Sequence, residues 1–161
     1  MVTKVVASSV RSRIAQLAFE MGLRILRASE FVLDCRSEDG LHNYEFSYMP
    51  FGHEHVDIEL SNLLEEEDDQ PHWAHIVAAC MQANKQCKNV LVVPVGGHQV
   101  AVRTEIPLTQ FNSRNVAYIQ DRMAELHDGA AVFFSRLADI EMGTNESTIP
   151  AFMIEHPEHL Q

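Results

Sequence analysis

The longest regular pattern in the chain is the stretch from residue 112 to residue 140, which reads NSRNVAYIQDRMAELHDGAAVFFSRLADI. Apolar residues recur in it at spacings of three and four, which places their side chains on one face of an α-helix. These residues are Val116, Ile119, Met123, Leu126, Ala130, Phe133, Leu137 and Ile140. The pattern predicts a long helix that needs a second apolar surface beside it. Asp128-Gly129 interrupts it, and because glycine in a helix costs about 1 kcal/mol relative to alanine, a kink or two separate helices also fit the sequence.

The segments before this stretch predict two more helices and three strands. Residues 9–23 carry an apolar stripe at helical spacing and end near Gly22, a residue that suits a helix C-terminus. We expect strands within 25–35, 43–49 and 55–60, separated by turn-forming residues. A second helix is expected over 71–88. It follows five consecutive acidic residues, 65–69, which either form a solvated loop or contact a basic partner peptide.

Residues 89–106 predict a β-hairpin, because Gly96-Gly97 supplies the two positions with φ > 0 that a two-residue turn needs. With these glycines as the turn, Val95 lies opposite His98. We expect the resulting apolar face of the hairpin to pack against the first half of the long helix. This face consists of Leu91, Val93, Val95, Val100 and Val102.

The expected order of elements is helix, three-strand antiparallel meander, helix, β-hairpin and long helix. This order predicts an α+β fold in which helices cover one face of an antiparallel or mixed sheet. Residues 1–142 are expected to form a single α+β domain. Residues 143–161 are expected to be an irregular C-terminal tail.

The second half of the long helix is apolar on nearly every side, which is typical of a buried helix. It is more apolar than one sheet face requires. We therefore expect it to be either intramolecular core or a protein interface for a second copy or a client. The interface residues predicted here are Ala130, Phe133, Phe134, Leu137 and Ile140.

The net charge of −11 is unevenly distributed along the 161 residues. Residues 1–36 contain six basic and three acidic side chains, a net +3, so the remainder carries −14. Such an acidic chain repels phosphate backbones, which argues against a nucleic-acid partner. No apolar run approaches the ~18 residues of a membrane span. Because the N-terminus also has no signal-peptide pattern, a cytoplasmic location without membrane contact is the expectation.

Candidate metal ligands occur in the third predicted strand. His53, His55 and Asp57 alternate along it, so their side chains would share one face, and nitrogen and oxygen donors of this kind suit zinc. A fourth ligand is not evident, and solvated or hydrogen-bonded histidines are the alternative. The three cysteines, Cys35, Cys80 and Cys87, are expected to be free thiols, with reactive or metal-binding thiols as the alternative.

Catalytic and cofactor motifs are missing from the sequence. It contains no GxSxG, no HExxH and no GxxxxGK[ST], so no catalytic residue and no cofactor is predicted. We therefore expect a protein that is not an enzyme.

The order of elements resembles the YbjN family, described as bacterial sensory-transduction regulators, and its relatives with the type III secretion chaperone-like fold. The resemblance extends over residues 10–141. Its most specific part is the strand at 100–108, whose end Glu105-Ile106-Pro107-Leu108 precedes the long helix. It implies a small acidic cytoplasmic protein, often a homodimer, that binds other polypeptides, and no family catalytic residues.

Two functions follow as hypotheses. The first is a non-enzymatic protein-binding module, chaperone-like or regulatory, that acts as a homodimer on an unknown polypeptide client. The alternative is a metal-binding protein or metal-dependent enzyme that uses His53, His55 and Asp57.

Overall fold

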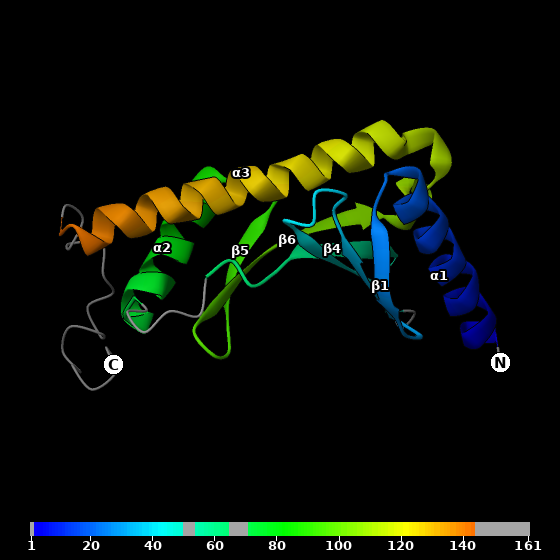
Figure 1. Ribbon diagram of the computed structural model, residues 1–161, viewed down its shortest axis with the longest axis horizontal. Coiled ribbons are helices and arrows are strands. Elements are labelled where there is room, and N and C mark those ends of the chain that lie inside the picture. The colour runs from blue at the N-terminus through cyan, green and yellow to red at the C-terminus, as the bar shows by residue number, and fades with distance from the viewer. Residues whose placement is uncertain (1, 50–53, 65–70, 144–161) are drawn as a thin grey trace.

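The computed structural model describes residues 2–49, 54–64 and 71–143. Figure 1 shows their arrangement, with the long helix α3 crossing above the sheet, α1 at one end and α2 at the other. The elements are α1 (Val2–Glu20), β1 (Arg24–Ala28), β2 (Val32–Arg36), β3 (Asn43–Ser47), β4 (His55–Leu60), α2 (Trp73–Gln86), β5 (Leu91–Val95), β6 (Gln99–Pro107), two 3-10 turns (Leu108–Gln110 and Ser113–Asn115) and α3 (Val116–Glu141).

The six strands form one antiparallel sheet in the order β1-β2-β3-β4-β6-β5. The first four strands follow each other as a meander. The chain then crosses through α2, so β6 pairs with β4 and β5 becomes the far edge. The predicted α+β class with an antiparallel sheet is confirmed.

One face of the sheet carries the core. Along β4, apolar residues alternate with polar ones, so Val56, Ile58 and Leu60 are buried while the residues between them point to the other side. The same alternation in β2 and β3 buries Leu33 and Phe46. All three helices contribute to this core. The opposite face of the sheet, called the open face below, carries polar side chains on β2, β3 and β4 and apolar ones on β5.

The meander has four strands, one more than the sequence predicted. The stretch expected as one strand from residue 25 folds back at Ser29, whose side-chain oxygen accepts a hydrogen bond from the backbone N–H of Val32 at 3.2 Å. The backbone N–H of Ser29 in turn donates to the carbonyl of Val32 at 2.8 Å. This turn contains no glycine or proline, so the usual sequence signal was missing. The first helix also differs from its predicted bounds, because it begins at Val2 and ends at Glu20.

The predicted hairpin exists, but its predicted register is wrong. Val95 pairs with Gln99, so the turn has three residues, and both Gly97 and His98 in it have positive φ, 74° and 59°. A shift of one residue exchanges the faces of β5. Val92 is consequently buried opposite Val102, whereas Leu91 is exposed.

Helix α3 is one unbroken helix from Val116 to Glu141, and Gly129 lies within it. It packs against β4, β5 and β6. The predicted contact between the long helix and the hairpin therefore exists, but β5 contributes to it with Val92 instead of the predicted Leu91. The second half of α3 packs against α2, which supplies the buried alanine side chains that the sequence pattern alone did not assign to this contact. The predicted tail, residues 144–161, lies outside the described residues.

Candidate functional site

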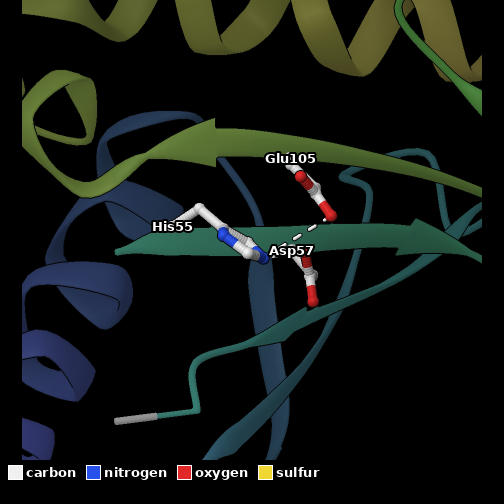
Figure 2. A group of neighbouring side chains, drawn as sticks. All are labelled: His55, Asp57 and Glu105. Carbon is white, nitrogen blue, oxygen red and sulfur yellow. Dashed lines mark ion pairs between the residues drawn. The ribbon is translucent and has the colours of Figure 1, made fainter. Parts of the chain in front are cut away.

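His55, Asp57 and Glu105 form a compact group on the open face of the sheet (Figure 2). His55 and Asp57 are two residues apart on β4, and Glu105 on β6 is the direct cross-strand neighbour of Asp57. The Nε2 atom of His55 lies 3.2 Å from Asp57 Oδ1 and 3.5 Å from Glu105 Oε1. One possible ligand atom from each residue lies within 4.8 Å of the other two. Two carboxylates and an imidazole nitrogen therefore converge on one point.

The neighbouring pair on the open face is an ordinary ion pair. Arg103 donates two hydrogen bonds to Glu59 Oε2, at 3.1 Å from Nε and 2.7 Å from an Nη atom. The hydrogen bond to Glu59 raises the pKa of Arg103. Next to it, burial raises the pKa of the Glu45 carboxyl, with the negative charges of Glu59 and Asp34 as further causes. This face is thus rich in carboxylates, and Arg103 forms an ion pair with one of them, Glu59.

Of the three metal ligands predicted from the sequence, the structure brings two together. His55 and Asp57 lie side by side as their alternation predicted, whereas His53 lies outside the described residues. Glu105 was not predicted from the sequence. The signal that could have found it is the pairing of β4 with β6, which joins segments about fifty residues apart and is not visible in a local pattern.

A second candidate site lies at the β1 edge of the sheet. All five residues of β1 are exposed, among them Ile25 at 42% and Leu26 at 43%. Beside the strand, the end of α1 and the turn after β2 enclose a hollow of about 390 Å³. Its wall includes Phe19, which is 80% exposed, together with Arg24 and Arg36. This edge combines exposed backbone, exposed apolar side chains and basic groups.

The opposite edge of the sheet is closed by comparison. Asn84 of α2 accepts a hydrogen bond from the N–H of Val92 at 2.7 Å and donates one to its carbonyl at 2.8 Å. Pro94, also on β5, has no N–H to offer. A side chain thus occupies the position that an added strand would take at Val92, which leaves β1 as the accessible edge.

The interface residues predicted on α3 are mostly inside the chain. Ala130, Phe133, Leu137 and Ile140 are buried in the core, while Phe134 is 42% exposed. An interface at this end of α3 stays a prediction. Of the five predicted residues, Phe134 is the one whose side chain is exposed enough to form a contact with another chain. The acidic residues 65–69, predicted as a loop or partner contact, lie outside the described residues.

The three cysteines are free thiols, as predicted. Burial raises the pKa of Cys35 to about 11 and that of Cys80 to about 12, and it also raises the pKa of the half-buried Cys87. A thiolate is the reactive and metal-binding form of cysteine, so these surroundings disfavour both kinds of chemistry.

The fold matches solved type III secretion chaperone structures. One is the type III secretion chaperone SycH of Yersinia pestis in complex with a stable fragment of YscM2, with a TM-score of 0.51, 9% identity, and coverage of 76% of this chain and 98% of that one. Another is a chain of the ExsC–ExsE complex, with a TM-score of 0.53, 16% identity, and coverage of 77% and 90%. No protein-family profile and no curated protein matches the sequence.

These likenesses establish the class of fold, which is that of the type III secretion chaperones. At such low identity they define the fold alone. Within the described part of the chain, no helix combines the length and the apolar character that crossing a membrane requires.

Proposed function

We propose that this chain is a non-enzymatic protein-binding module, chaperone-like or regulatory, that binds a segment of another polypeptide. The observation that carries the proposal is the accessible β1 edge with its exposed apolar side chains, beside a hollow. The fold supports it, because both similar structures hold a second polypeptide. Membership of the YbjN family and a cytoplasmic location stay predictions.

The proposed client segment binds as an added strand along β1. An exposed edge strand offers backbone N–H and C=O groups to an extended peptide, and side-chain pockets beside it provide selectivity. Here the hollow next to Phe19 would receive an apolar side chain of the client. Its wall carries Arg24 and Arg36 against one acidic residue, Glu38, and this net positive charge favours acidic residues next to that side chain. The client is therefore expected to be an extended segment with alternating apolar and acidic residues.

We further propose that the active form is a homodimer. The support is the end of α3, where Phe134 lies next to the buried stripe and is itself 42% exposed. This contact lies on a different element from the β1 edge. A dimer of this kind would leave the proposed client site accessible on each copy.

The client site can be tested by comparing two variants in capture experiments. The double variant Phe19→Ser/Leu26→Ser removes apolar surface at the β1 edge, and Met81→Ser removes another exposed apolar side chain, on α2. Both changes affect exposed positions, so both variants should fold, which circular dichroism checks. Tagged proteins are then used to capture partners from the native lysate and from purified candidates.

The expected result is a polypeptide that wild type and Met81→Ser retain and that Phe19→Ser/Leu26→Ser releases, with binding weakened at least tenfold. The basis is that removing a buried apolar anchor from an interface typically costs about 2 kcal/mol or more. Equal capture by both variants would show that the β1 edge is not the client site. Absence of any specifically captured polypeptide would contradict the protein-binding function itself.

A further inference from the structure

The group of His55, Asp57 and Glu105 places two acidic side chains in an unfavourable position. Asp57 and Glu105 face each other directly across β4 and β6. Like charges at directly opposed positions of an antiparallel pair destabilise the sheet. Such a pair is stabilised by a cation between the two carboxylates. The positive charge of Arg103 reaches Asp57, but the hydrogen bonds described for its guanidinium go to Glu59.

The imidazole of His55 is positioned to complete a cation site. Its Nε2 atom lies 3.2 Å from Asp57 Oδ1 and 3.5 Å from Glu105 Oε1. Ligands about 2.1 Å from a tetrahedral zinc ion are separated from each other by about 3.4 Å. The two nitrogen–oxygen distances therefore match two edges of a zinc coordination tetrahedron. Small side-chain rotations would bring the carboxylate oxygens to the third edge, since all three donors already lie within 4.8 Å.

The surroundings of the group also fit a metal ion. The Asp57 Oδ1 atom is shielded from solvent, which strengthens its interaction with a positive charge. The side chain of Glu105 is largely exposed, so an ion can enter from the open face. One nitrogen and two carboxylate donors favour zinc or a similar divalent transition metal over calcium, which prefers six to eight oxygen ligands.

We propose that His55, Asp57 and Glu105 form a binding site for one divalent transition-metal ion of the zinc class. The three residues supply three ligands, and water completes the coordination shell on the open side. The ion neutralises the opposed carboxylates and links β4 to β6 in the middle of the sheet. This site lies on β4 and β6, and β2 and β3 separate it from the β1 edge. The metal proposal therefore does not depend on client binding.

The test uses the full chain after treatment with a chelator. Zinc binding is measured by calorimetry, and Co²⁺ serves as a spectroscopic probe because its visible absorption reports the coordination number. The test variant is Glu105→Gln, which keeps the size of the side chain and one acceptor oxygen but removes the charge. The matched control is Glu54→Gln, because Glu54 is an exposed glutamate just before β4 that is not in the group. His72→Gln is the control for binding by exposed histidines elsewhere.

We expect wild type and both controls to bind one ion with similar affinity, and Glu105→Gln, Asp57→Asn and His55→Gln each to bind at least about tenfold more weakly. Zinc should raise the unfolding temperature of wild type but not of Glu105→Gln. Because Glu105→Gln also removes the repulsion with Asp57, it should fold without metal at least as well as wild type. Equal affinity of wild type and Glu105→Gln would overturn the proposal, and so would wild type that binds no zinc at millimolar concentration.

Discussion

Gly129 lies where α3 packs tightly against the side chains of Val90 and Val102. A Cβ atom at this position would lie 2.9 Å from Val90 Cγ2 and 3.0 Å from Val102 Cγ1. Valine side chains are stiff at χ1, so they cannot easily move away. The glycine that interrupts the sequence pattern is therefore explained by close packing, and it does not break the helix.

Replacement of Gly129 by alanine should lower the free energy of unfolding by about 1 kcal/mol. Alanine gains about 1 kcal/mol in helix propensity, but overpacking of this kind costs about 1–3 kcal/mol. Urea unfolding measures the difference. The control is Ala124→Gly at an exposed position of the same helix, which should lose about 1 kcal/mol through propensity alone. An increase in stability for Gly129→Ala would show that the contact with the valines is looser than described.

His127 connects α3 to β3 and to the residue just before that strand. Its Nε2 atom forms a hydrogen bond with the Tyr44 hydroxyl, and its ring lies edge-on to His42 at a centroid distance of 4.4 Å. Burial lowers the pKa of His127 below 6.5, and His42 lowers it further, while Asp128 and Asp39 oppose the shift. The folded protein therefore favours the neutral imidazole.

This shift predicts that stability falls in mild acid. Below pH 6.5 the unfolded chain takes up a proton at His127 more readily than the folded chain does, so stability is lost as the pH falls through the folded pKa. Urea midpoints measured at about pH 7.5 and about pH 5.5 should show a larger loss for wild type than for His127→Gln. The lowered pKa of Asp39 acts in a separate window, below 3.8. Identical losses for both proteins would exclude His127 as the cause.

At the scale of the elements, the long local patterns correctly predicted which segments are helices and which are strands, and their order along the chain. The stripe on α3 and the alternation along β4 each repeat often enough to fix which side chains are buried. The turn after β1 was not predicted, because a single serine side chain is its only signal in the sequence. The predicted register of the hairpin was wrong because Gly96-Gly97 fits a two-residue turn. The third turn residue, His98, is recognised only from its positive φ in the structure.

The candidate sites were harder to predict because they depend on which strands become neighbours. His55 and Asp57 belong to one strand, so their spacing predicted their proximity. Glu105 joins them through the pairing of β4 with β6 across the whole of α2. Similarly, α2 covers the second half of α3. Residues there that exceed what one sheet face can bury are therefore part of the core of this chain. Such long-range packing cannot be deduced from periodicity within one segment.

At the scale of the whole molecule, the contact between copies needs more surface than one side chain provides. A specific interface buries about 1,200–2,000 Å² in total, so Phe134 must be part of a wider patch. Met142, about two turns further along, is exposed as well. Both residues lie in the last part of the described chain, which makes this end of α3 the expected centre of the dimer contact.

Light scattering at about micromolar concentration tests the dimer. Wild type should show twice the monomer mass of 18.2 kDa, and Phe134→Ser should shift the equilibrium toward 18.2 kDa, since loss of a central aromatic anchor typically costs about 2 kcal/mol or more. Phe19→Ser serves as the control, because it removes an exposed phenylalanine from the other end of the molecule and should leave the mass unchanged. A wild-type mass of 18.2 kDa would rule out the dimer at that concentration. A dimer that both variants retain would place the contact on another surface, while client capture by Phe134→Ser would still report on the β1 edge alone.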